Sequence, residues 1–220
     1  MKINEIISKL RGLLKAYSDE TDFTDAYLWS LFCLSRSEIL SNKLKRYNFI
    51  NPSNYKTICL EMEKANAYEC GCIELDCTVY KSKNKISDVI SGRNISSLKV
   101  YPLLNNKEID YVDELEIDIY MQDDIFKNKP LYSIINKHIV LYNKNYPVIQ
   151  VRAIWGDILK LNEIQYCSDS VECLDYFNDD IGMSKEDVSK SIKMMFKDYL
   201  NILIKLPEDN TNDINETIKI

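Results

Sequence analysis

The feature that most constrains the fold is a change of hydrophobic period along the chain. Apolar residues three or four positions apart recur through residues 3–66, which predicts helices. Apolar residues at every second position recur between residues 72 and 155, which predicts half-buried strands. Helical spacing returns after Ser184. Helices followed by strands and a last helix predict an α+β fold with a central antiparallel sheet.

Three helices are expected in the N-terminal part. The first covers residues 3–17 and ends at the polar residues 18–22. Thr24 suits the N-cap of a second helix that runs to about Arg46, and the short connection predicts an antiparallel helical hairpin. Asn51 and Pro52 suit the N-cap and first position of a third helix. Its apolar face would consist of Tyr55, Ile58, Cys59, Met62 and Ala65.

The central part predicts several strands joined by short turns, at residues 72–80, 95–101, 115–121, 131–135, 138–142 and 148–155. Asn136 and Lys137 suit a two-residue hairpin turn, although Asn-Gly would suit it better. The alternation at 115–121 predicts that one set of side chains is buried, namely Leu115, Ile117 and Ile119. The opposite set should face solvent, namely Glu114, Glu116 and Asp118.

The C-terminal part predicts one helix and a polar tail. Ser184 and Asp187 resemble a capping box that opens a helix, which ends near Leu206 because Pro207 cannot continue it. Residues 207–220 offer only Ile214, Ile218 and Ile220 for burial, so this tail cannot order itself. Two interpretations remain open: the tail folds back on its own domain, or neighbouring subunits of an assembly hold it.

These patterns divide the chain into four parts. Residues 1–68 form a helical region and residues 69–160 an antiparallel β region. Residues 161–206 form an acidic loop and a C-terminal helix that packs on the helical region, and residues 207–220 form the extended tail.

The composition of the 220 residues limits the possible functions. A net charge of -6 argues against a general nucleic-acid binder, although a surface that lets DNA pass without sticking remains compatible with it. Five single glycines cannot build a phosphate-binding loop. We expect neither a signal peptide nor a membrane span. Seven cysteines without secretory context predict reduced thiols in a cytoplasmic product.

Three groups of residues could carry chemistry. The spacing of Cys59, Cys70, Cys72 and Cys77 does not suit a zinc site. His138, the single histidine, opens a hairpin strand, which favours a surface position over a catalytic triad. The densest charge cluster consists of the acids Asp110, Asp113, Glu114, Glu116, Asp118, Asp123 and Asp124. These acids favour a solvated strand face over a metal or acid–base site. We therefore predict no catalytic, cofactor or metal residues.

Four segments, taken in order, resemble the neck ring (head-to-tail connector) proteins of crAss-like short-tailed bacteriophages. The first runs from Ile7 to Arg46, with a helix, a Ser-Asp loop, Thr-Asp opening a second helix, and a downstream Ser-Arg-Ser. The second, TICLEMEKANAYECGCIELDCTVYKSKNKIS, leads into a strand followed by Lys-Ser-Lys. The third, LYSIINKHIVLYNKNYPVIQVRAIWGDILKL, combines a hairpin with a strand and Trp-Gly-Asp. The last is LIKLPEDNTND.

The resemblance covers residues from about 3 to 214 and implies a non-enzymatic virion subunit. Such a subunit would form a homo-oligomeric ring, twelvefold in this family, in the neck between portal and tail, with packaged DNA crossing its channel. It would be made in the bacterial host cytoplasm and would need no cofactor. Two other interpretations remain open. One is a cytoplasmic adaptor that binds a single partner through the N-terminal hairpin, and the other is a metal-dependent phage enzyme that uses the acids in 110–124.

Overall fold

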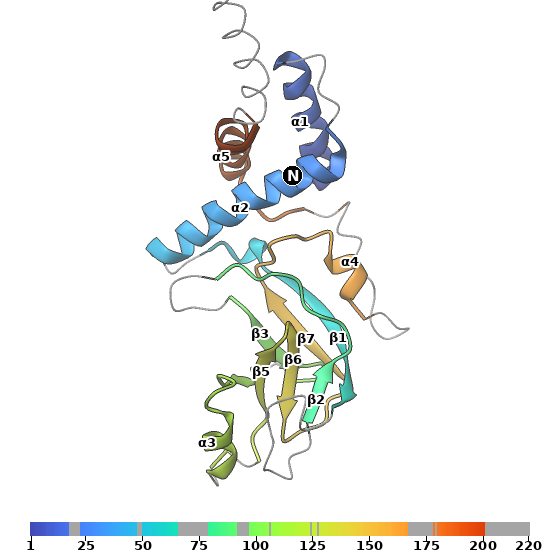
Figure 1. Cartoon of the computed structure of the whole chain (residues 1–220), viewed down its shortest axis with the longest axis vertical. Coiled ribbons are helices and arrows are strands. Elements are labelled where there is room, and N and C mark those ends of the chain that lie inside the picture. The colour runs from blue at the N-terminus through green and yellow to red at the C-terminus, as the bar shows by residue number, and fades with distance from the viewer. Residues whose placement is uncertain are drawn as a thin grey trace, which may run out of the picture. The chain divides into compact units, whose positions relative to one another are not determined.

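A computed structural model of the chain describes residues 1–17, 23–47, 50–65, 79–91, 97–105, 107–123, 125–126, 128–166, 178 and 180–200 (Figure 1). The α+β class is confirmed. The chain forms two compact units, one from residues 1–51 and 177–220 and the other from residues 52–176. The first unit is helical and the second is built on the sheet. No helix in the described part is long and apolar enough to cross a membrane.

The helical unit contains α1 (Ile3–Tyr17), α2 (Asp25–Tyr47) and α5 (Lys185–Met194), which continues as the π-helical turn η3 (Met195–Leu200). The expected caps are present. The Tyr27 amide donates to Thr24 Oγ1 at 3.3 Å, and the Asp187 amide donates to Ser184 Oγ at 3.1 Å. Local side-chain hydrogen bonds thus set where α2 and α5 begin.

The expected antiparallel hairpin of α1 and α2 is wrong, because α1 crosses α2 steeply (Figure 1). The reason lies in α2, which packs against both α1 and α5. Its buried side chains therefore spread around most of the helix instead of forming one stripe. They are Leu28, Trp29, Leu31, Phe32, Cys33, Ser35, Arg36, Leu40 and Leu44.

The expected third helix is also wrong. Pro52 opens only the 3-10 turn η1 (Pro52–Asn54), and the strand β1 (Lys56–Lys64) follows. In β1, Ile58, Leu60 and Met62 are buried at every second position. Because β1 pairs with strands on both sides, its backbone groups are satisfied within the sheet, and these residues belong to the sheet unit.

Seven strands of the described part form one sheet in the order β3-β7-β1-β2-β6-β5-β4. The remaining strands are β2 (Val79–Ser82), β3 (Lys99–Pro102), β4 (Asp110–Tyr111), β5 (Leu131–Ile135), β6 (His138–Tyr142) and β7 (Val148–Ala153). Neighbours are antiparallel except β4 and β5, so the sheet is mixed and the purely antiparallel expectation needs this correction. A short helix, α4 (Leu161–Ile164), follows the last strand.

The sheet curls until its two edge strands meet. An antiparallel bridge joins Val100 in β3 to Ile109, the residue that directly precedes β4, and the Ile109 amide donates to the Val100 carbonyl at 2.9 Å. The curled sheet therefore closes as a small barrel. Its inward side chains are fully buried or nearly so, namely Ile58, Leu60, Val100, Tyr132, Ile139, Leu141, Ile149 and Val151.

The predicted hairpin of β5 and β6 is confirmed with its turn at Asn136 and Lys137. Both turn residues have positive φ, 52° and 67°, which matches the right-handed twist of the two strands. Ile135 pairs with His138 and Leu131 with Tyr142. The predicted strand at 148–155 is confirmed as β7, with Ile149, Val151 and Ala153 on the buried face.

The predicted strand at 115–121 is wrong. A turn leads into the short helix α3 (Ile117–Gln122), whose N-cap is Glu116. Ile117 is 1% exposed and packs with Val112, Tyr120 and Phe126 over the outer face of β2, β5 and β6. Leu115 and Ile119, expected inside, are 90% and 70% exposed, because a helical turn points them away from Ile117.

Parts of other predictions lie outside the described residues. They are most of the strand at 72–80, the start of the strand at 95–101, the end of the last helix, and the tail at 207–220.

Candidate functional site

The acids singled out by the sequence do not converge on one point. Asp113 and Asp123 accept the amides of Leu115 and Ile125 at 3.0 and 2.9 Å, and so stabilise the turns on either side of α3. Glu114 and Glu116 are exposed, as expected, and Asp110 is exposed in β4. Asp124 lies outside the described residues. Within the described part, no three His, Cys, Asp or Glu residues are placed to hold a metal ion.

Of the four clustered cysteines, the structure describes only Cys59. Its thiol is free, lies half-buried in β1, and has a pKa raised by burial. Cys70, Cys72 and Cys77 lie outside the described residues, so the absence of a metal or disulfide among them stays a prediction.

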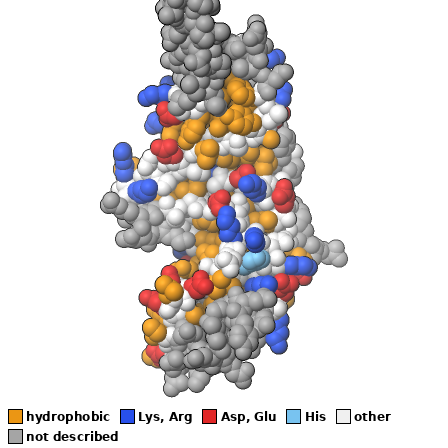
Figure 2. Space-filling view, viewed as in Figure 1, with side chains coloured by type: hydrophobic (Ala, Val, Ile, Leu, Met, Phe, Trp, Pro, Cys, Tyr) orange, Lys and Arg blue, Asp and Glu red, His pale blue; other side chains and the backbone are white. Residues whose placement is uncertain are grey.

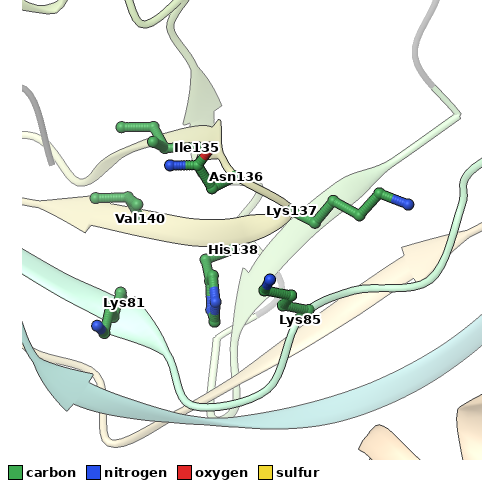
Figure 3. Close-up of a pocket in the computed structure, with 7 residues that line it drawn as sticks. All are labelled: Lys81, Lys85, Ile135, Asn136, Lys137, His138 and Val140. Atoms are coloured by element: carbon green, nitrogen blue, oxygen red, sulfur yellow. The ribbon is translucent and has the colours of Figure 1, made fainter. Parts of the chain in front are cut away.

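His138 lies at the start of β6, at the strand end where the sequence places it, and borders a pocket of about 770 Å³ in the sheet unit (Figure 3). Its Nδ1 lies 2.7 Å from the Ser82 carbonyl oxygen, so this nitrogen carries the hydrogen and donates it. Lys81 and Lys85 lie on either side of the ring, whereas Lys137 extends away from it. Ile135 and Val140 complete the apolar side.

Among its described lining residues, this hairpin pocket has neither a carboxylate nor a hydroxyl nucleophile. The positive charge is partly compensated, because Lys137 Nζ lies 2.6 Å from Asp88 and Lys81 Nζ lies 3.9 Å from Glu63. Lysines around an imidazole could attract an anion weakly, but they supply no acid–base pair aimed at a bound substrate.

A second concave surface lies in the helical unit, between α1 and the last turns of α5 and η3. We call it the lysine groove, and its volume is about 420 Å³. Leu13, Ile192 and Phe196 give it an apolar lining. Its charged lining residues are Lys9, Lys193 and Lys197, which are all exposed. None of these three ammonium groups forms an ion pair with another described residue.

A third feature is the outward side of α3 and its flanking turns, which we call the α3 surface. Leu115, Ile119 and Ile125 are 90%, 70% and 67% exposed on it, beside the carboxylates of Glu114 and Glu116. Figure 2 shows hydrophobic and acidic side chains interleaved over this helix. Burial, together with the charges of Asp113 and Glu114, raises the pKa of the adjacent Tyr111. The surface is therefore both apolar and negative.

The model of the phage tail ring protein 2 family of crAss-like phages matches residues 5–218. The chain belongs to this family. The resemblance to crAss-like ring proteins noted in the sequence is thereby confirmed, and the chain is a structural protein of the phage tail ring, located in the virion. No curated protein matches it.

Sequence reasoning missed both the lysine groove and the α3 surface. The lysine groove joins Lys9 and Lys193, which are 184 positions apart in the sequence, so no local pattern indicates it. The α3 surface was misread as a strand with Leu115 and Ile119 inside. One signal was present, because several acids interleaved with large apolar residues fit an exposed contact surface as well as a strand.

Proposed function

We propose that this tail ring protein is a subunit of the phage neck, in a closed homo-oligomeric ring between the portal and the tail, with twelve copies around the DNA channel. The observation that carries the proposal is the extent of the family match. It spans residues 5–218 and so covers both compact units. Copies of one chain that contact each other through two different surfaces form a ring when the rotation closes.

The proposed role is structural and involves no catalysis. The described part of the chain holds no cluster of metal-binding residues, and its hairpin pocket has no acid–base pair. A net charge of -6 suits a ring through which DNA slides, because phosphates and the acidic protein repel each other. The proposed channel therefore needs no specific DNA contacts.

The test is an image reconstruction of the neck of purified virions, combined with the mass of the purified chain alone and mixed with the portal protein. We expect a closed ring of this chain next to the portal, and a mass of twelve copies. The proposal would be overturned if the chain stays monomeric both alone and with the portal protein, and is absent from the neck. A complex of one copy with one host protein would favour the adaptor, and metal-dependent turnover would favour the enzyme.

A further inference from the structure

We infer that the α3 surface of one copy docks into the lysine groove of the next copy, and that this contact joins neighbours in the ring. The inference rests on the proposed ring function and names the two surfaces that would build it. The two surfaces carry opposite charges, and both expose apolar side chains.

The lysine groove requires a partner with both negative and apolar groups. Lys9, Lys193 and Lys197 supply three positive charges that no other described residue neutralises. Ile192 is 4% exposed, whereas Leu13 and Phe196 are half-buried. The apolar lining therefore keeps accessible surface that a binding partner could cover. A purely polar partner would leave this apolar lining exposed to water, and the three lysines would repel a basic partner.

The α3 surface meets that requirement. Leu115, in the turn before α3, and Ile119, in α3, are both largely exposed, next to Glu114 and Glu116. These two carboxylates form no ion pair with another described residue. Large apolar side chains exposed to this extent in a well-packed unit mark a contact surface. Negative groups around an apolar centre are the complement of the lysine groove.

The two surfaces differ from one another, and this difference matters for assembly. A patch that pairs with its own copy closes a twofold dimer, whereas two complementary patches on one chain give a head-to-tail contact. Each copy then offers one α3 surface and one lysine groove, so contacts continue around a ring. This geometry fits a tail ring protein, because it lets every copy have the same environment.

The test reverses the charges on each surface separately in the full-length chain. One variant carries Lys9→Glu and Lys193→Glu, and the other carries Glu114→Lys and Glu116→Lys. A control carries Lys107→Glu and Lys144→Glu, two exposed lysines of the sheet unit, which change the net charge as the first variant does. Circular dichroism melting checks that each variant folds, and native mass spectrometry measures assembly with and without the portal protein.

We expect each reversed variant alone to associate about 10–100-fold more weakly than the wild-type chain, because attraction becomes repulsion at several positions. The control should assemble normally. A mixture of the two reversed variants should assemble again, because each reversed α3 surface meets a reversed groove. Copies of the two variants should alternate around the mixed ring.

Three results would overturn the inference, and they separate it from the proposed function. If the wild-type chain forms rings and both reversed variants do so equally well, this contact is wrong while the ring function stands. If mixing restores nothing but one chain with all four substitutions assembles, the contact lies within a single copy. If the wild-type chain forms no ring even with the portal, the proposed function itself fails.

Discussion

The ammonium nitrogen of Lys43 lies 2.7 Å from each carboxylate oxygen of Asp187, which joins α2 to the first turn of α5 across 144 positions of sequence. Asp187 is 8% exposed. Its burial alone would raise the pKa of the carboxyl group, but hydrogen bonds from Lys43 and Ser184 and the charge of Lys43 outweigh it and lower the pKa. The ionised form is therefore the one that stabilises the fold.

Asp187→Asn is expected to lower the free energy of unfolding at pH 7 by about 1–2 kcal/mol, because a charge-assisted hydrogen bond is lost while Lys43 stays partly exposed. The folded-state pKa is depressed, so the contribution is complete above the unfolded value near 4 and disappears as the pH falls through the folded value. Urea unfolding between pH 7 and pH 2 measures it, and the difference between wild type and variant should vanish at the acidic end.

Glu186→Gln is the matched control for this prediction. Glu186 precedes Asp187 in the same turn and pairs with Lys190 at 2.7 Å, but both side chains are largely exposed. Solvent screens such a pair, so we expect little change in stability. Equal losses for the two variants would contradict the importance assigned to the buried pair.

Lys137→Gly is expected to stabilise the sheet unit by about 0.5–1 kcal/mol. Lys137 has φ 67°, a left-handed conformation that costs a side-chain-bearing residue roughly 1–2 kcal/mol. The substitution also removes an exposed ion pair with Asp88, which is worth about 0–1 kcal/mol. Thermal unfolding measures the sum. Asp88→Asn removes only the ion pair, and a Lys137→Gly chain less stable than this control would show that the turn is not strained.

Ile117→Ser and Ile119→Ser, two residues apart on α3, are expected to separate folding from assembly. Ile117 is 1% exposed, so its loss should cost about 2–4 kcal/mol of stability. Ile119 is 70% exposed, so its replacement should leave the melting temperature nearly unchanged while weakening ring formation. Calorimetry and native mass spectrometry measure the two effects. Loss of stability at Ile119 with normal assembly would contradict the role of the α3 surface.

The sequence predicts the parts of the fold that depend on neighbours in the chain. Thr24 and Ser184 cap helices through amides three residues on, and Asn136 with Lys137 turns a hairpin between adjacent strands. Each is a local interaction, so residue type and spacing suffice to identify it.

The prediction from sequence fails where the helical period and the strand period both fit the same residues. Ile58 and Met62 lie at helical spacing, but they also alternate with Leu60, which is 1% exposed and which the helix would have left on its polar side. Hydrogen-bonded pairing with β7 and β2 stabilises β1 as a strand, and these partners lie outside the segment whose periodicity was used. The same limit hides the lysine groove, because its lining residues Lys9 and Lys193 are 184 positions apart.

Deletion of Thr211–Ile220 is expected to leave the melting temperature of the isolated chain nearly unchanged while weakening assembly. The motive is composition, because residues 207–220 carry four acids, a single lysine and only three large apolar side chains. Such a segment cannot offset the roughly 1–2 kcal/mol per residue that ordering its backbone costs. We therefore expect the tail to lie against another copy in the ring.

The control for this deletion replaces the same ten residues with a Gly/Ser segment of equal length, which keeps the chain length and removes the side chains. Both variants should melt like the wild-type chain and should associate more weakly in native mass spectrometry. If the deletion instead unfolds the monomer, the tail packs on its own domain. That result would favour the fold-back interpretation and would leave the α3 surface and the lysine groove as the contacts that join the copies.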